Sequence, residues 1–203
     1  MSSLKTSVKE APRRRWPREK RRRQLIDVAW RLVRNKGSDA LTLGNLAEHS
    51  GVSKPVVYSH FKTREALLAA LYFEFDARQN AFFDASMEEG EKTLDGRAKV
   101  IAAVFVECML AQGQEIPEVI SALAGSPELA KVRRECEVIF IDKCRKLLGS
   151  FAGAAGLTAA GLWAILGAAQ VLTREMSTGQ FSPREAQDEI AEIIITLVKH
   201  TYG

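Results

Sequence analysis

The segment GVSKPVVYSHF, residues 51–61, places donor and apolar side chains in the first turn of a short helical stretch. Lys54 can donate a hydrogen bond to guanine or to a phosphate, and the proline and valine that follow offer apolar surface to a thymine methyl group. One turn later, the Tyr58 hydroxyl and the His60 imidazole are placed to reach phosphate oxygens. These residue types at this spacing indicate contact with a nucleic acid.

Two short helices must position these side chains. Proline in the first turn costs no hydrogen bond, because first-turn amides have no partner within the helix. We expect Ser53 to begin this helix, and Val57 and Phe61, four residues apart, to face inward. The preceding stretch begins with Thr42 as N-cap and should end at Ser50–Gly51. Helices joined by about three residues have helix-turn-helix spacing, in which the second helix exposes its first turn.

The helical period continues through the rest of the chain, and no strand pattern persists. We therefore expect an all-α fold of about nine helices, with short helices first and longer ones after a seam near residues 62–90. The helix that follows Thr63 should face inward through Leu67, Leu71, Phe75 and Phe82. The other helices are expected at about 18–36, 94–112, 116–125, 127–149, 158–177 and 183–201.

Positive charge is concentrated at the N-terminus. Residues 1–36 contain thirteen Lys or Arg and three Asp or Glu, although the net charge of the whole chain is only +4. This asymmetry indicates that one end of the protein meets a polyanion. The stretch RRRWPREKRRR, residues 13–23, is either a solvated flexible tail or an arm that follows phosphates or enters a minor groove, and the two interpretations are compatible.

The other residues that could take part in a reaction or bind a metal do not indicate catalysis. The three cysteines are odd in number and lack metal-ligand spacing, so we expect no disulfide framework and a reducing, cytoplasmic location. The histidines are scattered, no acidic or histidine cluster predicts a metal site, and no serine or cysteine has a base at motif spacing. We therefore expect neither an enzyme nor a protein that carries a metal or cofactor.

One uncharged stretch, between Lys146 and Arg174, is long enough to span a bilayer. It is rich in alanine and glycine and contains the polar residues Thr158 and Gln170. This composition favours a loop followed by a buried apolar helix, and we expect no contact with a membrane.

The sequence LTLGNLAEHSGVSKPVVYSHFKTREALLAALY, with the preceding LIDVAWRLVRNKGSDA, resembles the DNA-binding domain of the TetR/AcrR family of transcriptional repressors. The resemblance covers about residues 22–72. It implies an all-helical homodimer that binds a palindromic double-stranded DNA operator and is released by a small-molecule effector. The expected organisation is a flexible basic arm, a helix-turn-helix DNA-binding domain, and a larger ligand-binding and dimerisation domain, at 1–17, 18–63 and 64–203.

The resemblance also assigns the DNA contacts residue by residue. Phosphate contacts fall on Thr42, Tyr58 and Arg64. Base-facing positions of the recognition helix fall on four residues, with His60 at a further contact position: Lys54, Pro55, Val56 and Ser59. Gly44 stands where some members carry a long base-reading side chain, so that contact is absent here, and the basic arm could supply compensating affinity.

The last two long helices are expected to form the dimer interface, as they usually do in the family. Small residues on the first and a broad Ile/Leu face on the second agree with this, because a monomer would expose a larger apolar patch than soluble proteins normally tolerate. The alternative is that both helices fill the core of their own subunit. The expected interface residues are Leu162, Ile165, Leu166, Ala169, Ile190, Ile193, Ile194 and Leu197.

An effector pocket is expected among the helices at about 94–112, 127–148 and 158–177, and it should take an apolar or aromatic molecule. Each candidate lining residue could instead be an ordinary core residue. The candidates are Phe105, Cys108, Met109, Gln112, Phe140, Cys144 and Trp163.

Two alternative functions stay open on the same scaffold. One is a cysteine-based redox-responsive regulator, although Cys136 and Cys144 lie about 12 Å apart along one helix, too far to bridge. The other is an architectural nucleic-acid binder without an effector, which would have no buried cavity in its C-terminal domain.

Overall fold

The computed structural model describes residues 16–112, 115–153 and 156–200, except for the side chain of Gln112. Within these ranges the chain forms nine α-helices, two short 3-10 helices and no strand, so the expected all-α fold is confirmed. Most of the expected basic arm, residues 1–17, lies outside the described residues.

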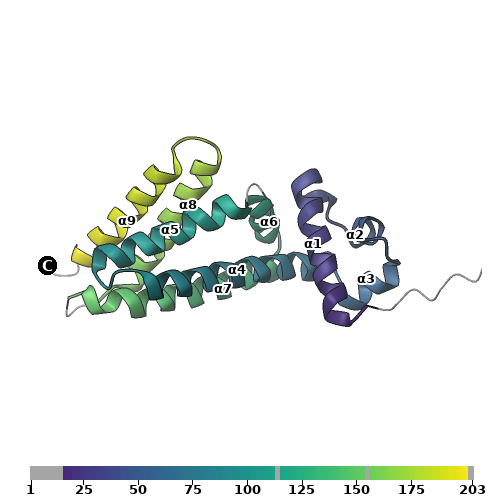
Figure 1. Cartoon of the computed structure of the whole chain (residues 1–203), viewed down its shortest axis with the longest axis horizontal. Coiled ribbons are helices and arrows are strands. Elements are labelled where there is room, and N and C mark those ends of the chain that lie inside the picture. The colour runs from purple at the N-terminus through teal and green to yellow at the C-terminus, as the bar shows by residue number, and fades with distance from the viewer. Residues whose placement is uncertain (1–15, 113–114, 154–155, 201–203) are drawn as a thin grey trace, which may run out of the picture.

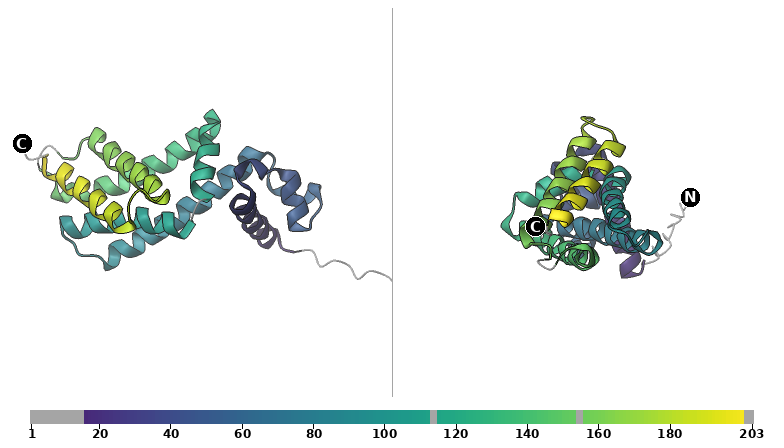
Figure 2. Two further views of the ribbon diagram at one scale, coloured as in Figure 1. Left: turned by 90° about the horizontal axis from the view of Figure 1, so that it is seen from above. Right: turned by 90° about the vertical axis from the view of Figure 1, so that its left-hand side faces the viewer.

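The molecule is elongated, with the first three helices grouped at one end and the last two toward the other (Figure 1). The view from above shows the same grouping, in which the N-terminal helices project from a longer bundle (Figure 2, left). The elements are α1 (Arg18–Lys36), η1 (Ser38–Ala40), α2 (Leu43–Ser50), α3 (Lys54–His60), α4 (Arg64–Glu89), α5 (Leu94–Gln112), α6 (Glu115–Ala124), α7 (Pro127–Leu148), η2 (Gly149–Phe151), α8 (Ala159–Ser177) and α9 (Pro183–Lys199).

Local capping signals explain where these helices begin. The Thr42 hydroxyl accepts a hydrogen bond from the Asn45 amide at the start of α2, and Thr63 caps α4 in the same way. Ser182 and Glu185 form the complete capping box of α9. Ser53 precedes α3, but its side chain makes no capping hydrogen bond, and the Val56 amide donates to the Ser53 carbonyl at 3.0 Å.

Two groups of buried side chains form the interior. The first joins α1, α2, α3 and the N-terminal half of α4 to α6 and the start of α7. The second joins the C-terminal half of α4 to α5, α7, α8 and α9. Because α4 takes part in both groups, it connects the end that carries α3 to the rest of the bundle (Figure 1).

The inward face of α4 differs from the expectation at one position. Leu67, Leu71 and Phe75 are buried, but Phe82 is 41% exposed and its neighbour Phe83 is 1% exposed. The buried face moves around the helix axis along α4, because the helix leaves the first group of buried residues and enters the second. The expectation for Phe82 was therefore wrong.

The uncharged stretch before Arg174 forms η2, a loop and α8, whose inner face is buried in the second group. Among the helices of the described residues, none combines the length and apolar character needed to cross a membrane.

Candidate nucleic-acid interface and effector cavity

The turn between α2 and α3 depends on Gly51. This residue has φ of 63°, in the left-handed region that favours glycine, and its amide contacts the carbonyls of Ala47 and Glu48. The Val52 amide also donates to the Ala47 carbonyl, at 3.1 Å. Val57, on the inner face of α3, is completely buried, so the opposite face of that helix is turned to solvent.

The expected base-reading residues lie on the solvent face of α3. Lys54, Pro55 and Ser59 are exposed and Val56 is partly exposed. A Cβ atom added to Gly44 would lie 3.9 Å from Cε of Lys54. The stem of Lys54 therefore lies against the surface of α2 at Gly44, where the absence of a side chain leaves room for it.

The expected phosphate-binding residues have different surroundings. Tyr58 is 48% exposed, and Thr42 is exposed although its hydroxyl caps α2. Arg64 is only partly exposed, because its Nε donates to the Leu41 carbonyl at 3.0 Å and its Nη2 to the Ser38 carbonyl at 2.8 Å. Arg64 thus fixes the loop before α2, and only its remaining donors are available for a phosphate.

His60 lies at the end of α3 beside the basic start of α1. Burial lowers the pKa of the imidazole, and the positive charges of Arg18, Arg22 and Arg21 lower it further against the opposing effect of Glu19. Its buried Nδ1 has no partner among the described residues. In the sequence these arginines are only part of a run of charge, and their position beside α3 depends on how α1 packs in the folded chain.

A cavity of about 380 Å³ lies within the larger helical part, between α4, α5, α6, α7 and α8. Three of the expected residues line it: Phe105, Met109 and Phe140. Three other expected residues do not line this cavity. Cys108 lines a separate surface hollow with Phe82, and Cys144 is packed in the core. Trp163 lies under the Arg134 guanidinium at 3.5 Å, and the side chain of Gln112 lies outside the described residues.

The cavity wall also has a polar part that sequence analysis missed. α4 contributes Tyr72, Asp76 and Gln79 beside Phe75, at the spacing of one helix face. α7 and α8 contribute a connected group in which Oε1 of Glu137 lies 3.3 Å from Arg133 Nε and accepts from Gln170 Nε2 at 3.1 Å. The sequence pattern that could have revealed this polar wall is a charged residue on the inward face of an amphipathic helix.

α6 joins the cavity to the N-terminal helices. Ile116 and Ile120 on α6 line the cavity. Glu115, which is 5% exposed, is paired with Arg34 of α1, and Oε2 of Glu118 accepts a hydrogen bond from the Ser38 amide at 2.7 Å. α6 therefore connects the cavity wall to the C-terminal end of α1 and to η1.

Most of the expected dimer residues are buried inside the subunit. Six of them are at most 4% exposed: Leu162, Ile165, Leu166, Ala169, Ile190 and Ile194. Within one chain they pack between α5, α8 and α9, as the alternative of an internal role predicts. Ile193 and Leu197 are partly exposed.

The cysteine environments disfavour redox chemistry. Burial raises the pKa of the Cys108 thiol to about 11 and those of Cys136 and Cys144 to about 12. A thiolate is the reactive form, so these thiols are poor nucleophiles near neutral pH.

An exposed helix-turn-helix at one end of a helical chain is an arrangement of DNA-binding proteins. The family described as bacterial regulatory proteins, tetR family, matches residues 25–71. The tetracycline repressor class D of Escherichia coli is 39% identical over 61 residues, which cover 30% of this chain and 28% of the repressor. These matches support a transcriptional regulator of the TetR/AcrR family whose DNA-binding domain includes residues 25–71.

Beyond the N-terminal helices, the similarity to known proteins extends over most of the chain at lower sequence identity. An uncharacterised HTH-type transcriptional regulator of Mycobacterium tuberculosis is 28% identical over 196 residues, which cover 91% of this chain and 79% of that protein. The crystal structure of a TetR/AcrR family regulator from Thermobifida fusca has a TM-score of 0.67 and 24% identity, over 87% of this chain and 97% of the other. This structural likeness shows that the fold is shared.

Proposed function

We propose that the protein is a homodimeric repressor that binds a palindromic DNA operator and leaves it when a small molecule enters the cavity. The observation that carries this proposal is the exposed face of α3, held outward by the buried Val57 and Phe61. The likeness of the N-terminal helices to tetracycline repressors favours repression over activation. Operator binding would place the protein with the bacterial chromosome, in the cytoplasm.

The proposed division of the chain has a basic arm at 1–17, a DNA-binding domain at 18–63 and a ligand-binding and dimerisation domain at 64–203. Tyr58 and Thr42, with the unused donors of Arg64, would bind phosphates. His60 would bind a phosphate beside the arginines of α1. The solvent face of α3 would read bases through four residues: Lys54, Pro55, Val56 and Ser59.

The proposed dimer interface uses the outward face of α8 in place of its buried face. This face carries small or short side chains at helical spacing, which would allow two copies of α8 to approach closely. The partly exposed Ile193 and Leu197 of α9 would extend it. The residues of the α8 face are Ala160, Ala164, Gly167, Ala168 and Val171.

The proposed release mechanism uses the two helices that connect the cavity to α1. α4 forms part of the cavity wall and holds α1 through Glu74, whose carboxylate contacts Arg23 at 2.7 Å and Trp30 Nε1 at 3.3 Å. α6 holds the other end of α1 through Glu115 and Glu118. To bind the operator, the two α3 helices of the dimer must lie one DNA turn apart, about 34–36 Å. A ligand that changes the tilt of α4 or α6 would change this distance.

Selection of duplexes from a random pool by the full chain tests this function. We expect enrichment of inverted repeats whose half-sites lie about one turn apart, and binding that weakens steeply with salt. Tyr58→Ala should weaken binding to enriched and unrelated duplexes alike, because a phosphate contact carries no sequence information. Recovery of unrelated sequences, or a shallow salt dependence that reflects only one or two phosphates, would contradict the proposal.

Operator affinity should also rise as the pH falls. A phosphate beside His60 favours the protonated ring, whereas burial and the α1 arginines keep its pKa low in the free protein, so binding takes up a proton between the two pKa values. Fluorescence anisotropy between about pH 5.5 and 8 measures this dependence. His60→Gln should flatten the profile, and an unchanged profile in that variant would exclude the phosphate contact.

The same group has the opposite effect on the stability of the free protein. Its folded-state pKa is lowered, so the unfolded chain takes the proton first as the pH drops below about 6.5. The contribution of His60 to stability is therefore present above that pH and is lost below it.

A further inference from the structure

One carboxyl group in the cavity wall has no basic partner. Asp76 is partly buried on α4, where its Oδ2 accepts from Asn80 Nδ2 at 3.1 Å and its carboxylate also interacts with the Cys136 thiol. No ion pair to Asp76 occurs among the described residues, and the nearby Lys143 is already paired with Asp84 at 2.8 Å. Burial of this carboxyl raises its pKa, which reflects the cost of leaving the charge without a cation.

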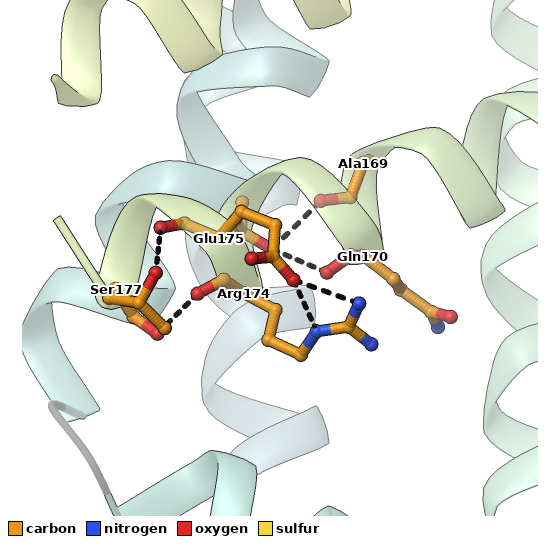
Figure 3. Close-up of polar contacts among 7 residues, drawn as sticks. Ala169, Gln170, Arg174, Glu175 and Ser177 are labelled. Atoms are coloured by element: carbon orange, nitrogen blue, oxygen red, sulfur yellow. Dashed lines mark hydrogen bonds and ion pairs between the residues drawn. The ribbon is translucent and has the colours of Figure 1, made fainter. Parts of the chain in front are cut away.

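The cationic side chains of the wall are already neutralised. Arg133 is paired with Glu137, and Arg174 at the edge of the cavity is paired with Glu175 at 3.0 Å (Figure 3). Glu137 is 8% exposed, and both of its hydrogen-bonding contacts in the described structure reach the same oxygen, Oε1. Among the described residues, the cavity therefore offers acceptor oxygens that have no partner, and each of its two arginines already has an acidic partner.

The remaining wall is largely aromatic. Phe105 and Phe140 meet edge to face with their ring centroids 5.2 Å apart, and Phe75 lies across the cavity on α4. Tyr72 is 6% exposed and lines the same wall, and its hydroxyl donates to no residue in the described part of the chain. The faces of such rings attract a positive charge, and the free hydroxyl can bind a ligand acceptor or amine.

We propose that the effector is an amphipathic aromatic amine or similar organic cation, with its charged nitrogen beside Asp76 and Glu137 and its rings against Phe75, Phe105 and Phe140. The proposal rests on the effector role proposed above for the cavity. An anionic ligand would have to compete with Glu137 for Arg133, where the buried carboxylate would lose its cation, or with Glu175 for Arg174 at the edge of the cavity. The sequence predicts an apolar or aromatic effector, and the structure adds that this effector carries a positive charge.

Three probes of similar shape separate charge from size: 1-naphthylmethylamine is cationic, 1-naphthylmethanol is neutral and 1-naphthoate is anionic near neutral pH. In isothermal titration calorimetry with the full chain, the amine should bind at least about tenfold more tightly than the other two. Asp76→Asn should remove about tenfold of the amine affinity and change the affinity of the alcohol by less than about twofold. Glu88→Gln removes one negative charge at an exposed position of the same helix and leaves the pair of Lys143 and Asp84 intact, so it should alter none of the three affinities.

Three results would overturn the proposal: equal affinity for the amine and the alcohol, tightest binding of the naphthoate, or no binding of any probe. If Asp76→Asn does not fold, Glu137→Gln replaces it, with the same selective loss expected for the amine. Failure of the proposed regulatory function is a separate result, seen as the absence of sequence-specific duplex binding by the ligand-free protein in a gel-shift assay.

Discussion

Replacing Phe83 with alanine should lower the free energy of unfolding by about 3–5 kcal/mol. The ring is 1% exposed and meets the edge of Phe140 with a centroid distance of 5.4 Å. Its removal loses the transfer free energy of a large apolar group and leaves a cavity between α4 and α7 that the long helices cannot readily close. Urea denaturation followed by circular dichroism measures the change.

The adjacent phenylalanine provides a matched control. Phe82 is 41% exposed, and Phe82→Ala should change the free energy of unfolding by less than about 0.5 kcal/mol. The two variants remove the same atoms from neighbouring positions, so their difference isolates the direction of the buried face of α4. Similar losses in both variants would contradict the change of inward face along this helix.

Replacing Arg34 with glutamine should uncouple the cavity from the DNA-binding helices. The buried Glu115 carboxylate would lose its guanidinium partner, and a charged hydrogen bond to a buried group contributes about 1.5–3 kcal/mol. We expect the loss of operator affinity caused by saturating 1-naphthylmethylamine to shrink by about tenfold, within the usual range of allosteric coupling. Anisotropy titrations of the operator with and without the amine measure this ratio.

Arg31→Gln is the appropriate comparison for this variant, because Arg31 is exposed on the same helix and the change in charge is identical. Its only expected effect is a lower operator affinity through long-range electrostatics. The loss of operator affinity caused by the amine should be the same as in the unmodified protein. A full response in Arg34→Gln would show that the contact between α1 and α6 is not part of the path and would leave α4 as the connection.

Sequence patterns predicted the DNA-binding end well because its structure depends on local signals. The N-cap at Thr42, the left-handed turn at Gly51 and the inward pair Val57 and Phe61 all act within a few residues along the chain. The same holds for the capping box at Ser182. These features require no knowledge of how distant helices pack.

The cavity and the outer surface depend on distant packing, and the sequence was less informative there. Arg133 and Glu137, four residues apart, have the spacing of an ordinary surface ion pair, and only the packing of α8 through Gln170 encloses them. Asp76 could have been recognised as a charge on the inward face of its helix. Apolar residues such as Leu162 are equally compatible with a core or an interface, because both remove them from water.

The length of α4 sets the mechanical sensitivity of the whole molecule. Its 26 residues correspond to a rod of about 39 Å at 1.5 Å per residue. If one end is held by the bundle, a tilt of only about 5° moves the other end by roughly 3 Å, a large fraction of the rise of one base pair. In the proposed symmetric dimer the displacements of the two α3 helices add. A ligand that shifts the cavity wall by less than the width of one atom could therefore move both α3 helices away from the spacing of their half-sites on the DNA.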